Sequence, residues 1–172
     1  MNPVADFPAQ ASHSVLLDLP LAQAWSKLQD LSLAAHYVPD LTGCVLPPGP
    51  EKGLGASRRV FQKNGQWLDE TVLQWQEGQG FVIRLHRAQN GAPFPFTQAC
   101  FAYALVADGK ATRLTTRLLY QPAGGVIGAL LDRWLLRRAL NKVVAQIARN
   151  LKAYYETGIT QNPAYKSLTS KR

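Results

Sequence analysis

The chain has 172 residues, of which 47% are hydrophobic and 17% charged. This length is enough for one domain that buries an apolar core without disulfides. Cys44 and Cys100 are too few for a disulfide framework, so we expect two free thiols. No apolar run approaches the roughly 20 residues that span a bilayer. The first ten residues also lack the pattern of a secretory signal. We therefore expect a soluble, cytoplasmic protein without a cofactor.

The net charge is +8, from 19 Lys and Arg against 11 Asp and Glu. An excess of this size is typical of proteins that meet an acidic ligand, a nucleic acid or an anionic membrane, or of a solvated basic surface. No nucleic-acid-binding motif accompanies the charge, so we expect no nucleic-acid partner. His13, His36 and His86 are too scattered to predict a metal site. A transient contact with an anionic membrane stays open.

The first quarter of the chain predicts one strand followed by short helices. Apolar residues centre a strand over 12–19, and Pro20 then opens a helix whose apolar positions recur at helical spacing up to Leu28. A second short helix is predicted over 30–41. The proline- and glycine-rich stretch 43–55 indicates a loop or an edge strand.

The middle of the chain predicts an antiparallel meander. Asn64-Gly65 and Asp108-Gly109 are strong hairpin signals between runs of strand-forming residues. Adjacent strands joined by such tight turns pair antiparallel. The predicted strands are 57–63, 66–76, 81–88, 97–106 and 111–121.

A long helix is predicted over 126–156, but its apolar face is not continuous. At about 100° per residue, the apolar stripe changes direction near Arg137-Arg138. Either the helix is kinked or preceded by a short helix there, or it is straight and exposes the apolar segment 126–135, including Trp134. An exposed patch would serve a protein partner, a membrane or the mouth of a cavity. The later stripe consists of Leu140, Val144, Ile147 and Leu151.

These elements predict an α+β fold. A curved antiparallel sheet of about six to seven strands would surround the long C-terminal helix, with two short helices after the first strand. We expect one domain over residues 12–158. Residues 1–11 are expected to form a flexible segment, and residues 159–172 a polar tail.

Several short motifs occur in an order that resembles the SRPBCC superfamily, the START-related and polyketide-cyclase-like proteins of the helix-grip fold. The resemblance extends over roughly residues 12–157. It rests on Asp18-Leu19-Pro20 with Ala24-Trp25 and Leu28, on Gly55 with Arg58 or Arg59, on Glu70, on Thr112-Arg113-Leu114, and on Tyr120 to Gly125 leading into Leu130 to Arg133 and Leu151-Lys152.

The resemblance implies a cavity between the sheet and the long helix. Members of the superfamily bind or transport lipids and other apolar molecules, and some cyclise polyketides. The expected function is therefore binding or transport of a lipid, polyketide-like or isoprenoid-like molecule, by a monomer or a homodimer. A polyketide cyclase or aromatase is the enzymatic alternative. A protein-interaction module that uses the segment 126–135 is a second alternative.

Strand alternation suggests which side chains would face such a cavity. On the last strand Leu114, Thr116, Leu118 and Tyr120 share a face that keeps the arginines in water, and Tyr103 lies on the apolar face of the preceding strand. Hydroxyls in an apolar cavity typically orient a ligand, so the candidates are Tyr103, Thr116 and Tyr120.

The strand 66–76 has two faces that compete for the interior. Its apolar content favours the face of Trp67, Asp69 and Trp75, and the two tryptophans are then expected to form cavity wall. The resemblance instead draws attention to Glu70, on the other face. Both registers stay open at this stage.

The cyclase alternative needs an acid–base set. Glu70 with Arg84 or His86 is the candidate set, since a carboxylate beside a cation or an imidazole can move protons on a polyketide-like substrate. Alternation along 81–86 sends Arg84 and His86 outward, however, where they would be solvated side chains. An ion pair would also explain Glu70.

Overall fold

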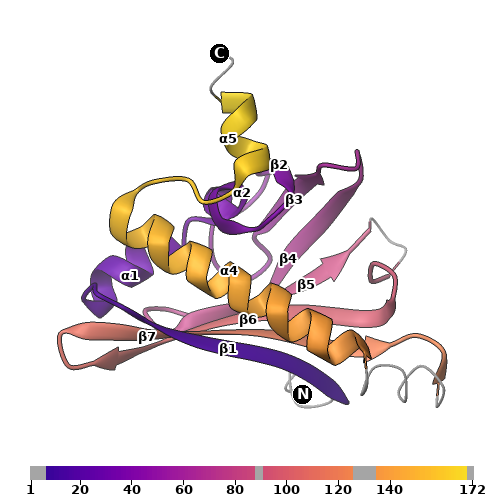
Figure 1. The fold of residues 1–172 in the computed structure, drawn as a ribbon, viewed down its shortest axis with the longest axis horizontal. Coiled ribbons are helices and arrows are strands. Elements are labelled where there is room, and N and C mark those ends of the chain that lie inside the picture. Colours follow the sequence, from indigo (N-terminus) through magenta and orange to yellow (C-terminus); the bar gives the residue numbers. More distant parts are fainter. Residues whose placement is uncertain (1–6, 88–90, 126–134, 170–172) are drawn as a thin grey trace.

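A computed structural model describes residues 7–87, 91–125 and 135–169. Figure 1 shows a curved sheet, with a long helix lying across its concave face and short helices at one end. The elements in chain order are β1 (Ala9–Leu17), α1 (Leu21–Leu28), the 3-10 turn η1 (Leu31–Leu33), α2 (Ala34–Tyr37), β2 (Leu41–Val45), β3 (Ser57–Gln62), β4 (Trp67–Gln76), β5 (Gly80–His86), β6 (Phe96–Asp108), β7 (Ala111–Pro122), α4 (Arg137–Thr157) and α5 (Pro163–Thr169).

The seven strands form one antiparallel sheet in the order β1-β7-β6-β5-β4-β3-β2. From β2 to β7 each strand pairs with the next along the chain, which confirms the predicted meander. Asn64-Gly65 turns β3 into β4, and Asp108-Gly109 turns β6 into β7, with both glycines at positive φ. β1 pairs with β7, so the N-terminal strand closes one edge of the sheet beside α4.

Helix α4 packs one face against the sheet. Its buried residues include Val144, Ile147, Leu151 and Tyr155, as the apolar stripe of the later part of the predicted helix indicates. Gly158, in the left-handed conformation at φ 73°, ends the helix and donates its N–H to the Tyr154 carbonyl. Arg137 and Arg138 lie at the start of α4, but Trp134 and the rest of the segment 126–134 lie outside the described residues, so the expected change of face stays a prediction. Leu135 is described, and it is 70% exposed.

The short helices follow sequence signals. Pro20 precedes α1 in an extended conformation, and Ala24, Trp25 and Leu28 form its buried face. The Asp30 carboxylate accepts from the Ser32 N–H and so caps η1. The predicted helix over 30–41 is divided among η1, α2 and the start of β2. β2 is an edge strand that extends into the stretch 43–55, which was expected to be a loop or an edge strand.

Regular secondary structure extends into both terminal segments that the sequence left without it. β1 begins at Ala9, inside the segment expected to be flexible, because Ala9 and Ala11 are buried on the face toward the core. In the expected polar tail, α5 forms after Asn162, a buried residue whose amide donates to the carbonyls of Ala35 and Leu41. Neither segment has a strong apolar pattern. The small alanines and the amide hydrogen bonds that hold these segments leave no signal that the sequence prediction could use.

A β-bulge in β4 decides which residues of that strand face the helix. Val72 pairs with Ile83, but the next pair is Gln74 with Val82, so one extra residue enters β4. Before the bulge, Leu68, Glu70 and Val72 are buried on the inner face. After it the alternation shifts by one residue, which turns Trp75 inward, onto Phe81.

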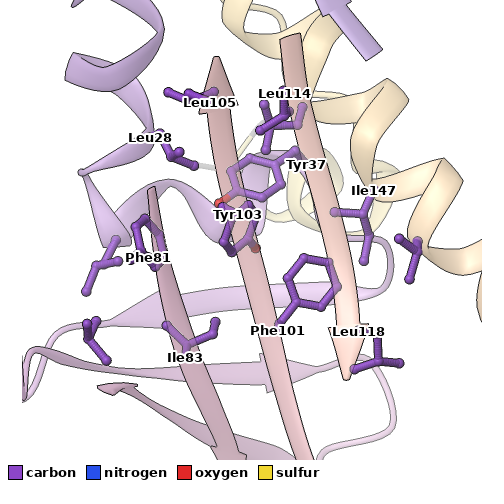
Figure 2. Close-up of a cluster of buried hydrophobic side chains, with 14 of the residues drawn as sticks. Leu28, Tyr37, Phe81, Ile83, Phe101, Tyr103, Leu105, Leu114, Leu118 and Ile147 are labelled. Carbon is purple, nitrogen blue, oxygen red and sulfur yellow. The ribbon is translucent and has the colours of Figure 1, made fainter. Parts of the chain in front are cut away.

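The inner face carries a row of aromatic rings. Trp75 stacks on Phe81 with ring centroids 5.4 Å apart, Phe81 lies 5.1 Å from Tyr103, and Tyr103 lies 4.9 Å from Phe101. Figure 2 shows Phe81 on β5 and Tyr103 and Phe101 on the neighbouring strand β6, with Tyr37 beside Tyr103 and Ile147 of α4 across from them. The core between the sheet and α4 is therefore aromatic.

Substitution of Gly80, at the start of β5, tests how closely β5 and β6 approach each other at this position. A Cβ at this position would lie 2.0 Å from the Tyr103 carbonyl oxygen, and Gly80 has φ 146°. We expect Gly80→Ala to lower the unfolding free energy by at least about 2 kcal/mol, because the strands must separate. Gly78→Ala is the control, with positive φ but open space. Urea denaturation measures both, and equal losses would contradict the close approach.

His36 joins α2 to the C-terminal segment. Its ring stacks on Tyr154 at 4.5 Å, its edge meets Tyr165, and Nδ1 hydrogen-bonds the Thr160 hydroxyl at 2.8 Å. Burial lowers the His36 pKa from 6.5, and Asp30 only partly opposes this. Below pH 6.5 the unfolded chain therefore binds a proton more readily than the folded chain. As a result, the free energy of unfolding decreases as the pH falls through this range.

We expect His36→Phe, which keeps a ring on Tyr154, to weaken the loss of stability below about pH 6.5. Urea midpoints measured from pH 7.5 to pH 5 for both proteins test this. Parallel pH curves would contradict the lowered pKa of the partly buried His36.

Candidate functional site

A buried ion pair lies on the inner face of the sheet. Arg58 on β3 and Glu70 on β4 are cross-strand partners, so their side chains leave the sheet on the same side. The Arg58 Nε donates to the Glu70 Oε2, and the two residues are 2% and 9% exposed. Two charges this far from water remain there only because each compensates the other.

The other donors of Arg58 are also used. Its Nη1 donates to the Leu31 carbonyl at 3.0 Å, and the guanidinium hydrogen-bonds the hydroxyls of Tyr37 and Tyr103. Burial opposes the Arg58 charge, but Glu70 and the tyrosines hold the Arg58 pKa well above its usual value. The planar guanidinium thus joins η1, α2, β4 and β6. We call Arg58, Glu70, Tyr37, Tyr103 and Tyr155 the buried polar cluster.

The three tyrosines of the cluster are neutral hydrogen-bond donors at physiological pH. Burial is the main cause that raises the pKa of Tyr37, and it holds the pKa values of Tyr103 and Tyr155 well above the usual range. Tyr155 comes from α4, and its ring meets Tyr37 edge-on at 6.1 Å. The cluster therefore connects the sheet to α2 and α4.

The Tyr155 hydroxyl is the one member without a partner. It is buried, and no group among the described residues hydrogen-bonds to its Oη. A buried hydroxyl left unsatisfied costs about 1–3 kcal/mol, and such groups are rare in folded proteins. The site thus combines a polar cluster, an unsatisfied hydroxyl and the aromatic row of the inner face.

The predicted ligand-orienting residues all lie on the inner face. Tyr103 belongs to the buried polar cluster. Thr116 and Tyr120 on β7 are fully buried; the Thr116 hydroxyl donates to the His13 carbonyl at 3.3 Å, and Tyr120 packs against Phe96. The expected inward face of β7 is therefore confirmed, while a contact of these residues with a ligand stays a prediction.

The two tryptophans predicted to form cavity wall lie on opposite faces of the sheet. Trp75 joins the aromatic row, and its indole N–H and that of Trp25 both donate to the Glu77 carboxylate at 2.8 Å. Trp67 lies on the opposite face of the sheet, where Arg59 stacks over its ring at 4.1 Å. The shared face expected for the two tryptophans is wrong, because the β4 bulge between them changes the alternation.

The predicted acid–base set does not assemble. Glu70 faces the interior, whereas Arg84 is exposed on the outer face of the sheet, and half-buried His86 bonds through Nε2 to the Thr71 hydroxyl at 2.9 Å. In the ladder Glu70 pairs with Leu85, while Arg84 pairs with Thr71, so Glu70 and Arg84 leave opposite sides. Glu70 forms an ion pair with Arg58 instead.

Sequence reasoning missed Arg58, Tyr37 and Tyr155 as site residues. The hairpin at Asn64-Gly65 contained a usable signal, because its register places Arg58 opposite Glu70 and Arg59 opposite Asp69. Tyr155 lies four residues after Leu151 on the apolar face of α4, where a helical turn repeats. That its hydroxyl lacks a hydrogen-bond partner within the described part of the chain depends on tertiary packing, which no local sequence pattern predicts.

The described residues do not suggest a metal centre or a membrane span. Within 7–87, 91–125 and 135–169, no three His, Cys, Asp or Glu side chains gather closely enough to hold a metal ion. In those ranges no helix has both the length and the hydropathy for crossing a bilayer. Burial raises the pKa of Cys44 to about 11, so its thiol is protonated.

Comparison with known proteins identifies the family. Residues 8–156 match the family model described as polyketide cyclase / dehydrase and lipid transport. The chain belongs to this family. It is a member of the SRPBCC superfamily with the α+β helix-grip fold, as the order of its sequence motifs indicated. No curated protein sequence matches it significantly.

Solved structures of low sequence identity share the helix-grip fold of this chain. A START superfamily protein from Mycobacterium smegmatis is 17% identical, with a TM-score of 0.65 over 86% of this chain and 97% of its own. A protein from Thermus thermophilus gives the same TM-score and coverage at 14% identity. DynU16, from the dynemicin biosynthetic locus, is 20% identical with a TM-score of 0.56, over 88% of this chain and 48% of its own.

The ion pair makes a direct stability prediction. Glu70→Gln leaves the Arg58 charge buried without a counter-charge, so we expect the unfolding free energy to fall by about 3–5 kcal/mol. Asp69→Asn is the control, because Asp69 pairs with the half-exposed Arg59 on the outer face. It should cost less than about 1 kcal/mol. Urea unfolding of both variants measures the difference, and similar losses would show that the Arg58–Glu70 charges are not buried.

Proposed function

We propose that this protein binds a hydrophobic small molecule between the sheet and α4, and that a polar oxygen of this molecule accepts a hydrogen bond from Tyr155. The observation that carries the proposal is the buried Tyr155 hydroxyl without a partner among the described residues. A ligand carbonyl, hydroxyl or carboxyl group would satisfy it. The hydrophobic body of the ligand would lie along the aromatic row.

The chemistry around Tyr155 supports this role. Binding sites for small molecules typically have apolar and aromatic walls with a few polar groups that fix orientation. Here Phe81, Phe101 and Ile147 supply apolar surface, and Tyr103 and Tyr155 supply hydroxyl groups. Because the polar cluster is already held by its own ion pair, little side-chain entropy remains to be lost on binding.

The family supports the ligand class. Its description includes lipid transport as well as cyclisation and dehydration of polyketides. DynU16, which shares the fold, belongs to the dynemicin biosynthetic locus. We therefore propose a lipid-like or polyketide-like ligand, with Trp75, Thr116 and Tyr120 as further lining residues and without Trp67.

A cyclase or dehydrase reaction would have to use the buried polar cluster. The neutral hydroxyl of Tyr103 and the cationic Arg58 are the groups that would polarise a carbonyl, with Glu70 already committed to Arg58. Arg84 and His86 lie on the far face of the sheet and have no role in such a reaction. Binding remains the proposal that Tyr155 supports.

Native mass spectrometry tests the proposal. The protein is purified from expressing cells without organic solvent, and the bound mass is compared for wild type, Tyr155→Phe and Tyr154→Phe. Tyr154→Phe is a matched control, since Tyr154 is the neighbouring residue and stacks on His36, and the substitution keeps the ring that packs beside Tyr155. We expect wild type and the control to retain a small molecule with a polar oxygen.

Tyr155→Phe should retain about tenfold less of this molecule, the effect of one lost hydrogen bond in a buried site. Equal retention by Tyr155→Phe and wild type would show that Tyr155 does not bind the ligand. Recovery of the wild type without any small molecule, even after incubation with total lipid extract, would contradict the proposed function itself.

A further inference from the structure

A second pocket lies where the sheet opens between β5 and β6. The ladder between these strands ends at Arg84 and Cys100, although β5 continues to His86 and β6 begins at Phe96. The separated strand ends enclose a hollow of about 470 Å³. This volume is within the usual range of small-molecule sites, about 300–1,000 Å³.

The lining of this hollow combines apolar side chains with the polar His86, Thr97 and Gln98, and Arg84 is its one arginine or lysine among the described residues. Phe7 and Leu73 approach from the outer face, and Leu85, Ala92 and Ala99 form the side nearest the core. No Asp or Glu contributes to it among the described residues. Burial raises the pKa of Cys100 to about 11, so the lining thiol is an uncharged group.

Arg84 differs from two other arginines of the outer face, Arg59 and Arg113, in having no carboxylate partner within the described ranges. Arg59 is paired with Asp69, and Arg113 with Asp108. Arg84 has no ion-pair or hydrogen-bond partner among the described residues, and it borders the hollow. An exposed arginine beside an apolar pocket without carboxylates favours an anionic group attached to an apolar body.

We propose that the hollow between β5 and β6 binds an amphipathic organic anion, an aromatic or acyl carboxylate or sulfonate, with its charged group on Arg84. The apolar part of the anion lies against Phe7, Leu73 and Leu85. His86, whose Nε2 bonds the Thr71 hydroxyl, borders the charged end. This site is on the opposite side of the sheet from Tyr155, and it does not rest on the proposed function.

The probe for this site is 1-anilinonaphthalene-8-sulfonate, an apolar aromatic anion. Fluorescence titration gives its Kd for wild type, Arg84→Gln, Arg117→Gln and Gln98→Trp. Arg117 is a matched control, an exposed arginine of the same sheet face on β7 that does not line the hollow. Gln98→Trp places a large ring at an exposed lining position and occupies the hollow.

We expect Arg84→Gln and Gln98→Trp each to raise the Kd about tenfold, and Arg117→Gln to change it less than twofold. Amide NMR shifts of the wild type with the probe should centre on residues 84–86 and 97–100. The proposal is overturned if Arg84→Gln and Arg117→Gln give the same Kd, or if the shifts centre on Tyr103 and Tyr155. That second result would favour the interior site, so the two proposals fail separately.

Discussion

The buried pair of Arg58 and Glu70 is the constraint on which the arrangement of this site depends. Once the β3–β4 hairpin places both charges inside, neither can be left alone without a large desolvation cost. The remaining donors of Arg58 then require acceptors, which the Leu31 carbonyl and two tyrosine hydroxyls supply. The pair thereby holds the short helices, the sheet and the polar end of the interior in one geometry.

The two faces of the sheet carry side chains of different chemical character. The inner face carries neutral tyrosines, the buried pair and an aromatic row, which together suit a hydrophobic molecule with one polar oxygen. The outer face carries exposed arginines, Trp67 and the hollow beside Arg84. A single extra residue in β4 contributes to this division, because Leu73 lies on the outer face and the bulge then turns Trp75 inward. Without that bulge, Trp67 and Trp75 would share a face.

Local patterns predicted the meander, the inner faces of β6 and β7 and the later stripe of α4, because hairpin turns and side-chain periodicity are local properties. They could not predict the face of Trp75, because the bulge depends on pairing with β5. They also missed the structured ends, where Ala9, Ala11 and Asn162 give little apolar signal. The site was found in part: Tyr103 and Glu70 were candidates, but the union of Arg58, Tyr37 and Tyr155 arises from residues far apart in the chain.

The most direct test of the account is a crystal structure of the protein as purified, at a resolution that shows individual ligand atoms. The account predicts a small molecule between the sheet and α4, with an oxygen about 3 Å from the Tyr155 Oη and with its apolar body against Phe101 and Ile147. It also predicts that Arg58 still bonds Glu70. A Tyr155 hydroxyl bonded to a group of the protein itself, in an interior filled only by side chains, would contradict the account.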